Sequence, residues 1–273
     1  MITDVLVHLD STAAGRERME YAFNIAATHG ARLTGAHVLA PVDVPPYYRP
    51  SAVERVSESM ERHAREDATT SEALFRTRAA KASIPTLWRS LEGGLAHRIC
   101  ELARSADIVI LGQYEAEGSP ERHPLYLADD VVVGCGRPVV VTPDEIGAAA
   151  ALKRALLGWD GSREAVRAIH DVLPLLVVAH SQVEIVVVDQ HEPELDPTDL
   201  LDHLARHGIA VDASQHIHSH RSAGSALVEQ LNARKFDLLV MGAYGRPAWL
   251  EFLFGGATKS ALTHATTPVL VSH

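Results

Sequence analysis

Four glycines stand between two apolar segments near the end of the sequence. Gly242 and Gly245 follow the run "DLLVM", which predicts a buried strand, and Gly255 and Gly256 precede "ATKSALTHA", which predicts a helix. The first N–H groups of a helix have no partner within it and carry partial positive charge. Glycines let the backbone approach an anion closely, and Thr258 adds a hydroxyl. The pattern therefore indicates a phosphate site.

Charged residues near these glycines bear on the same chemistry. Arg246 and Lys259 could neutralise phosphate, although a solvated surface role suits each of them equally well. Asp160 ends another apolar run, in "LLGWDGSREA", where its carboxylate can accept hydrogen bonds. The sequence contains no G-x-x-x-x-G-K-[ST] or G-x-S-x-G motif, so we assign no catalytic residue and expect any ATP hydrolysis to be slow.

The stretch "HIHSH" places three histidines at alternating positions. In an extended strand, His216, His218 and His220 would point to one face, and imidazoles are good ligands of zinc and copper. No cysteine or obvious acidic fourth ligand adjoins them. We therefore expect no metal site and interpret these histidines as exposed strand-end or loop residues.

The elements that position these residues follow from the periodicity. Apolar runs such as Val5–Leu9, Val183–Val188 and Leu238–Met241 alternate with segments of helical period, including a long helix from about Ala52 to Lys81. This alternation predicts an α/β fold with open parallel sheets covered on both faces. In such sheets, ligands sit beyond the carboxyl ends of the strands, where the connections diverge.

Two helices have predictable ends and faces. Ser162 is expected to cap the helix after Asp160, and Gly30 is expected to end the equivalent first-half helix in a left-handed conformation. The residues expected to face the core are Met19, Phe23 and Ala26 in the first helix and Val166, Ile169, Leu173 and Leu176 in the second.

The chain repeats itself. "ADIVILGQY" matches "FDLLVMGAY", so that Asp107 pairs with Asp237 and Gly112 with Gly242, and upstream Asp10 pairs with Asp160. The polar and alanine-rich passage "TPDEIGAAAALKR" separates the copies, which places two domains at residues 1–146 and 147–273.

Each copy ends in a short strand that would form a sheet edge. Unpaired edges invite a partner strand. We expect Val139–Val141 and Val269–Val271 to pair across a pseudo-twofold axis, so that one chain forms an intrachain pseudo-dimer.

The spacing Gly-x2-Gly-x9-Gly, together with the strand that ends in Asp160, resembles the ATP-binding universal stress protein family, over nearly the whole chain as a tandem pair. The resemblance implies two Rossmann-like domains and an adenine nucleotide, ATP or AMP, with or without Mg²⁺. Asp160 would accept hydrogen bonds from the nucleoside, Val188 and Met241 would shape the adenine slot, and the glycine loop would line the ribose and phosphates. The implied binding residues are Asp160, Val188, Met241, Gly242, Gly245, Arg246, Gly255, Gly256, Ala257 and Thr258. Where this chain has Gly256 the family usually has Ser or Thr, so one hydroxyl contact is lost.

The first copy departs further from this pattern. At the positions of Gly245, Gly255, Gly256 and Thr258 it has Glu115, Leu125, Tyr126 and Ala128. A carboxylate and bulky side chains there would repel or obstruct phosphate. Asp10 remains, as a strand-end aspartate that can merely cap the next helix. We expect one nucleotide per chain, in the second copy.

Net charge, apolar runs and cysteine content limit which ligand classes and which cellular compartment we expect. A net charge of −10 without a basic run argues against nucleic acid, and no 18-residue apolar run or signal peptide is seen, which argues against membrane and favours the cytoplasm. Cys100 and Cys135 are interpreted as structural thiols in a reducing compartment.

The resemblance implies a stress-response protein that signals or binds an unknown protein partner according to its nucleotide. A homodimer of such chains is compatible with this reading. Two alternatives stay open: a slow ATPase, and a nucleotide-free scaffold that binds a small ligand or a protein.

Overall fold

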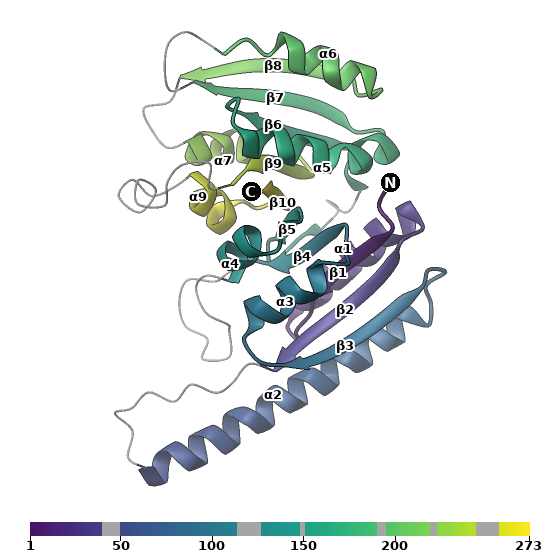
Figure 1. Ribbon diagram of the computed structural model, residues 1–273, viewed down its shortest axis with the longest axis vertical. Coiled ribbons are helices and arrows are strands. Elements are labelled where there is room, and N and C mark those ends of the chain that lie inside the picture. The colour runs from purple at the N-terminus through teal and green to yellow at the C-terminus, as the bar shows by residue number, and fades with distance from the viewer. Residues whose placement is uncertain (40–49, 114–126, 148–150, 190–194, 219–222, 244–256) are drawn as a thin grey trace.

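The computed structural model describes residues 1–39, 50–113, 127–147, 151–189, 195–218, 223–243 and 257–273. Side chains are described throughout these ranges except at 50–57, 188–189, 217–218, 223–224 and 257. Figure 1 shows the resulting arrangement, with the two halves of the chain stacked along the longest axis.

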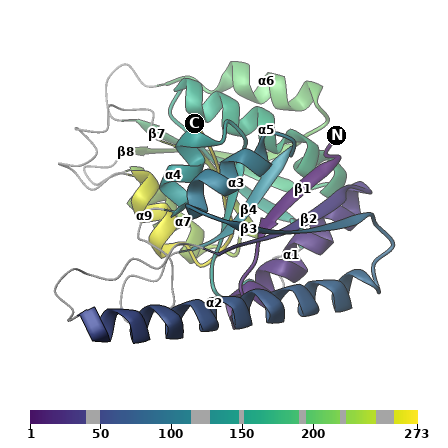
Figure 2. The same cartoon turned by 60° about the horizontal axis from the view of Figure 1, so that its bottom comes forward.

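Strands and helices alternate along the chain, as the apolar pattern predicts. The N-terminal half contains β1 (Asp4–His8), α1 (Ala13–His29), β2 (Arg32–Leu39), α2 (Pro50–Ala79), β3 (Thr86–Glu92), α3 (Leu95–Ala103), β4 (Ile108–Gly112), α4 (Leu127–Gly134) and β5 (Val139–Thr142). The C-terminal half contains β6 (Arg154–Trp159), α5 (Arg163–Ala179), β7 (Gln182–Asp189), α6 (Thr198–Arg206), β8 (Val211–His218), α7 (Ala223–Ala233), β9 (Leu238–Gly242), α9 (Ala257–His264) and β10 (Val269–Ser272). The long helix expected from about Ala52 is α2, which packs on β2 and β3, while its first turns project beyond the sheet (Figures 1 and 2).

The described strands form one ten-stranded sheet in the order β3-β2-β1-β4-β5-β10-β9-β6-β7-β8. Neighbours within each half are parallel, and each half has the same order when read from its outer edge to the centre. The prediction of two tandem parallel-sheet units is therefore confirmed.

The halves meet through their last strands. β5 and β10 pair antiparallel, with Val139 opposite Val271 and Val141 opposite Val269. The predicted pairing of these two edges is thus confirmed, and the chain forms a pseudo-dimer by itself. A side-chain bond from Gln113 Nε2 to the carbonyl oxygen of Ala265, at 2.7 Å, adds a polar contact across the same junction.

Helices cover both faces of the sheet. One buried apolar cluster includes side chains of α1, α2, α5 and α6, such as Phe23, Phe75 and Leu204. The other includes side chains of α3, α4, α7 and α9, such as Ile99 and Leu262. Each cluster contains residues of both halves, so the core is continuous across the junction.

Local signals explain the ends of the two longest core helices. The Ser162 hydroxyl accepts a hydrogen bond from the N–H of Ala165, and Gly30 adopts φ 63°, so both predicted caps are confirmed. The N-cap of α1 is Thr12 rather than Asp10. The expectation for Val166 was wrong: it is 40% exposed, because α5 turns its small Ala165 and Ala168 toward the sheet instead.

The matched aspartates of the repeat have a structural role at the amino ends of the strands. Asp107 accepts hydrogen bonds from the N–H groups of Thr3 (2.7 Å) and Asp4 (3.0 Å). Asp237 accepts equivalent bonds of 2.7 and 2.9 Å at the start of β6. Each aspartate thus fixes the register of two neighbouring strands.

Candidate functional site

A crevice is expected where the helices after two neighbouring strands leave toward opposite faces of the sheet. β6 and β9 are such neighbours, since α5 follows β6 on one face and α9 follows β9 on the other. Asp160 comes directly after β6, and Gly242 is the last residue of β9. Two predicted site residues therefore flank this topological switch point.

Gly242 permits a close approach between β9 and the first turn of α5. A Cβ added to Gly242 would lie 2.5 Å from the backbone nitrogen of Ala165 and 2.7 Å from the carbonyl carbon of Glu164. Real Cβ atoms essentially never come so close to other atoms. A glycine is therefore required at this strand end by packing, whatever its role toward a ligand.

Asp160 is exposed at the same switch point. Its Oδ1 accepts hydrogen bonds from the N–H (3.0 Å) and hydroxyl (2.6 Å) of Ser162, whose hydroxyl in turn accepts from the N–H of Ala165 at 3.2 Å. Among the described residues, no hydrogen bond reaches Oδ2 of Asp160. One carboxylate oxygen thus orients the side chain, and the other is directed to solvent or a ligand.

The segment that leaves β9 is held by the end of the chain. The N–H of Ala243 donates to the carbonyl of Ser272 at 2.9 Å, and a ring nitrogen of His273 lies 3.0 Å from the carbonyl of Ala243. The Ser272 hydroxyl donates to Asp171 of α5 at 2.7 Å. These contacts fix the position of Ala243, the last described residue after β9.

Other predicted site residues divide into three groups. Thr258, in the first turn of α9, is buried, and Ala257 is the first residue of that helix. Met241 is buried in the cluster that includes α7 and α9, and Val188 lies near the end of β7, with its side chain outside the described part. The remaining residues, Gly245, Arg246, Gly255 and Gly256, lie outside the described residues.

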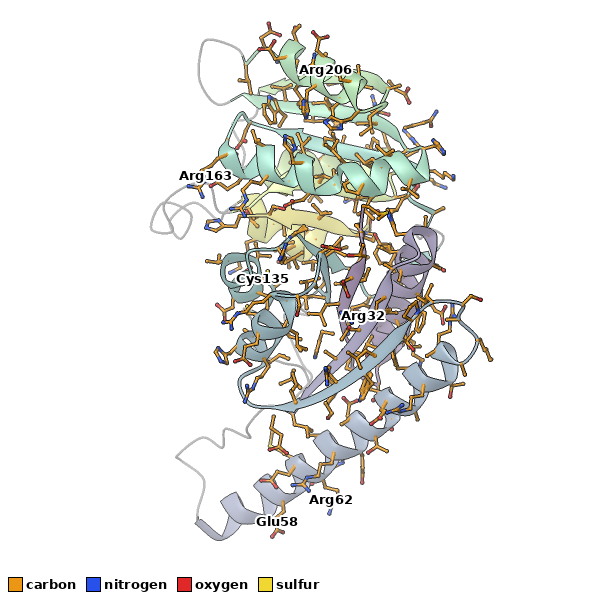
Figure 3. All side chains as sticks on the ribbon, turned by 45° about the vertical axis from the view of Figure 1, so that its right-hand side comes forward. Arg32, Glu58, Arg62, Cys135, Arg163 and Arg206 are labelled. Carbon is orange, nitrogen blue, oxygen red and sulfur yellow. The ribbon has the colours of Figure 1, made fainter. Side chains whose placement is uncertain are left out.

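A buried carboxylate adjoins the crevice. Glu164, in the first turn of α5, is 6% exposed, and its Oε1 lies 3.0 Å from Nε of Arg163. Arg163 is exposed at the edge of the molecule (Figure 3). A negative charge such as that of Glu164 is favourable at a helix N-terminus. The positive charge of Arg163 reduces the repulsion that this carboxylate would exert on a bound anion.

At the equivalent strand ends of the N-terminal half, the aspartate is paired with a buried arginine. Arg18 of α1 is 3% exposed, and its Nη2 lies 2.5 Å from Oδ2 of Asp10. Burial acts to raise the pKa of the Asp10 carboxyl, but the charge of Arg18 and the hydrogen bonds from Thr12 outweigh it and hold the pKa well below its usual range. The two halves therefore present chemically different strand ends.

The comparison with family models identifies both halves. The model of the universal stress protein family matches residues 1–126 and 151–273. The chain belongs to this family. No curated protein matches it.

Solved structures show the same fold over the whole chain. A universal stress protein from Archaeoglobus fulgidus DSM 4304 is 16% identical, with a TM-score of 0.71, and the match covers 98% of this chain and 96% of that one. A functionally unknown protein from Pseudomonas aeruginosa PAO1 is 11% identical with a TM-score of 0.57, covering 99% and 92%. A putative universal stress protein from P. aeruginosa UCBPP-PA14 is 10% identical with a TM-score of 0.57, covering 99% and 93%.

Among the described helices of this family member, none is long and apolar enough to span a membrane.

Cys100 and Cys135 are both free thiols, and burial raises the pKa of each. Raised pKa values make these thiols poor nucleophiles at neutral pH.

Two of the histidines singled out from the sequence, His216 and His218, lie on β8 at the far edge of the sheet. His216 is exposed on β8, the side chain of His218 lies outside the described part, and His220 lies outside the described residues. In the described residues, no group of three His, Cys, Asp or Glu side chains is placed to hold a metal ion.

A different histidine cluster, which the sequence did not suggest, joins α5 to α6. The ring of His203 lies 5.0 Å from that of His170 and 4.7 Å from that of His207, measured between centroids. The Nε2 atom of His203 is buried without a hydrogen-bond partner. His203 and His207 are neighbours one helical turn apart at the end of α6, and the packing of α5 against α6 brings His170 to them.

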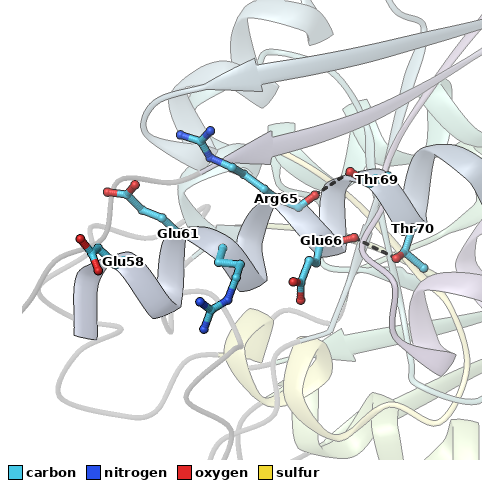
Figure 4. Close-up of a pocket in the computed structure, with 7 residues that line it drawn as sticks. Glu58, Glu61, Arg65, Glu66, Thr69 and Thr70 are labelled. Atoms are coloured by element: carbon cyan, nitrogen blue, oxygen red, sulfur yellow. Dashed lines mark hydrogen bonds between the residues drawn. The ribbon is translucent and has the colours of Figure 1, made fainter. Parts of the chain in front are cut away.

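A shallow groove of about 630 Å³ follows one side of α2 (Figure 4). Both acidic and basic side chains line it, and the hydroxyls of Thr69 and Thr70 donate to carbonyls one turn earlier in the same helix, at 2.8 Å each. Its described lining comes from this one helix: Glu58, Glu61, Arg62, Arg65, Glu66, Thr69 and Thr70. A ligand site needs polar groups that converge from several elements, so the crevice at β6 and β9 remains the better candidate.

Proposed function

We propose that the C-terminal half binds one adenine nucleotide, ATP or AMP, with or without Mg²⁺, in the crevice between β6 and β9. In the cytoplasm, the bound nucleotide would control the engagement of a partner protein during stress. Family membership supports the stress-response role, and the site's geometry supports the ligand class.

The observation that carries the proposal is the state of Asp160. Its side chain is exposed at the switch point, and Ser162 engages one carboxylate oxygen while the other has no partner among the described residues. A carboxylate acceptor at this place suits the hydroxyl donors of a ribose. The first turn of α9, which begins at Ala257, offers N–H groups and partial positive charge to the phosphates.

The loop residues Gly245, Arg246, Gly255 and Gly256 complete the proposed phosphate site on sequence grounds. Val188 and Met241 are assigned to the adenine end, and Thr258 to the phosphate end. Glu115, Leu125 and Tyr126 at the equivalent first-half positions support a single nucleotide per chain.

Calorimetric titration with ATP and with AMP, each with and without Mg²⁺, tests the proposal. We expect a stoichiometry of one and at least a tenfold loss of affinity in Asp160→Asn, which removes the charge of the acceptor, since tenfold corresponds to about 1.4 kcal/mol. Asp10→Asn, verified as folded, is the matched control and should leave affinity unchanged. A wild-type chain that binds neither nucleotide, or binds two, would contradict the proposal, and phosphate release in the same samples measures any hydrolysis.

A further inference from the structure

The aspartates that follow β1 and β6 occupy equivalent positions but are held in different ways. Asp160 has one oxygen engaged, by Ser162, as described above. Asp10 has both engaged: Oδ1 accepts from the N–H of Thr12 at 3.0 Å and from its hydroxyl, and Oδ2 pairs with Arg18 at 2.5 Å. Both carboxylate oxygens of Asp10 are therefore engaged by the protein itself, whereas Oδ2 of Asp160 has no hydrogen bond among the described residues.

Arg18 is fixed across the ends of two strands. Its Nε donates to the carbonyl of His8, the last residue of β1, at 2.7 Å. A Cβ added to Gly112, the last residue of β4, would lie 3.0 Å from Cζ of Arg18 and would overlap Nη1. The guanidinium thus occupies space at the first switch point, where in the second half the first turn of α5 packs directly on Gly242.

Gly15 provides the room for Asp10 to turn back toward α1. A Cβ added to Gly15 would overlap both the carbonyl oxygen and Oδ1 of Asp10. Counted from the N-caps Thr12 and Ser162, the residue equivalent to Gly15 is Ala165. A Cβ is therefore present in the second half where the first half cannot hold one.

The residue equivalent to Arg18 is Ala168, which is buried and carries no charge. The second half thus lacks both the glycine that makes room for the aspartate and the arginine that pairs with it. In the first half, α2 adds a further contact: Asp67 accepts a hydrogen bond from the N–H of Ser11 at 2.9 Å, which occupies the backbone donor next to Asp10.

We propose that Arg18 is a specificity-determining residue, which together with Gly15 withdraws Asp10 from the N-terminal crevice and so confines adenine nucleotide to Asp160. The inference rests on the proposed function. To present a carboxylate oxygen as free as that of Asp160, Asp10 would have to give up its pair with the buried Arg18. That change would leave the Arg18 charge uncompensated, which is strongly unfavourable. This device acts in addition to the loop substitutions at Glu115, Leu125 and Tyr126.

The first test follows the Asp10 carboxyl itself by ¹³C NMR of the full chain in Arg18→Met, which keeps the length of the side chain and removes the guanidinium. We expect the wild-type Asp10 resonance to stay in its ionised position to the lowest pH at which the protein is folded. In Arg18→Met it should titrate near the ordinary aspartate pKa of about 3.9. If that variant does not fold, Gly15→Ala, which displaces Asp10 by its Cβ, should also alter the titration. Identical titration in wild type and the folded variant overturns the proposal.

The second test transfers the arrangement to the nucleotide half. Ala165→Gly combined with Ala168→Arg should lower ATP affinity at least tenfold, whereas Ala165→Gly with Ala168→Met, which adds comparable bulk without charge, should stay within about threefold of wild type. Unchanged affinity in the arginine variant, or equal losses in both, overturns the ion-pair explanation. A wild-type chain without nucleotide affinity refutes the proposed function instead, and the Asp10 titration then still decides the role of Arg18.

Discussion

Val140 of β5 lies directly opposite Leu270 of β10, at the centre of the antiparallel ladder that joins the two halves. Both side chains are fully buried, and both belong to the cluster that includes α1 and α5. We therefore expect the halves to unfold together in a single transition, since neither can expose its last strand without opening the shared core.

Leu270→Ala tests this coupling. Truncation of a fully buried leucine should lower the free energy of unfolding by about 2–5 kcal/mol. Urea unfolding can be followed in each half separately, by the fluorescence of Trp88 or of Trp159 in single-tryptophan variants. Both probes should report the same decrease in the free energy of unfolding. Val133→Ala, at a 52% exposed apolar side chain of α4, is the control and should change little. Separate midpoints for the two tryptophans would show that the halves are independent domains.

The two strand-end glycines give a matched pair of substitutions. In Gly242→Ala the new Cβ meets backbone atoms of α5 at 2.5 and 2.7 Å, which cannot yield without moving the helix. In Gly112→Ala it meets Cζ and Nη1 at the far end of the Arg18 side chain, which we expect to shift slightly while Nη2 keeps its pair with Asp10. We expect Gly242→Ala to cost about 1–3 kcal/mol of stability and Gly112→Ala to cost less.

ATP titration separates the two variants further. Gly242→Ala should weaken binding, because it shifts the start of α5 and with it Asp160, while Gly112→Ala should leave binding unchanged. Equal thermal midpoints and equal affinities for the two variants would show that the close approach seen at Gly242 has no energetic consequence.

Much of the fold could be predicted because its signals are local. The alternation of apolar runs and helical periods determined the parallel sheets, and the edge strands at Val139–Val141 and Val269–Val271 determined how the halves meet. The caps at Ser162 and Gly30 depend only on neighbouring backbone groups. The prediction for Val166 failed because α5 has two adjacent stripes, one of small alanines and one of larger apolar side chains. The helical period alone does not tell which stripe faces the sheet.

The candidate site was predictable in part. The strand-end positions of Asp160 and Gly242 followed from the sequence pattern, and the fold brings them to one switch point. The role of Arg18 could not be foreseen, because an arginine in a helix is ordinarily solvated. Its position depends on the missing Cβ of Gly112, and the position of its partner Asp10 depends on the missing Cβ of Gly15. The clue that sequence did offer was glycine inside the first turn of α1, where a helix former is expected.

The His170, His203 and His207 cluster predicts a pH dependence of stability. Burial lowers the pKa of His203, and the nearby His207, His170 and Arg206 act in the same direction. Because the folded pKa lies below the ordinary value of 6.5, the neutral form favours folding. This contribution is fully present above pH 6.5 and is lost as the pH falls below it.

Thermal unfolding of wild type and His203→Gln between pH 8 and pH 5 measures this contribution. The wild type should lose more stability than the variant as the pH falls, because the variant has one imidazole fewer to protonate. His63→Gln, at an exposed histidine of α2, should follow the wild-type curve. Parallel curves for wild type and His203→Gln would show that the cluster does not oppose protonation.

Asp107 predicts a second pH dependence, at lower pH. Burial acts to raise the pKa of its carboxyl, but hydrogen bonds from the N–H and hydroxyl of Thr3 and the N–H of Asp4 outweigh it and lower the pKa. A depressed folded pKa means that the ionised form stabilises the fold above the ordinary pKa of 3.8, and that this stability is lost as the pH falls through and below that value.

Asp107→Asn should therefore lower the free energy of unfolding at pH 7 by about 1 kcal/mol, since the site is partly solvated, and by less as the pH approaches 3. The amide keeps one acceptor oxygen but places an N–H₂ group among donors, so the strand starts at β1 and β4 lose their shared anchor. Urea unfolding at pH 7, 5, 4 and 3 measures the difference. Asp212→Asn, at an exposed position of β8, controls for the loss of one negative charge and should match wild type at each pH. A stability difference for Asp107→Asn that stays constant from pH 7 to pH 3 would mean that the carboxylate's charge contributes nothing and that only its shape holds the two strands together.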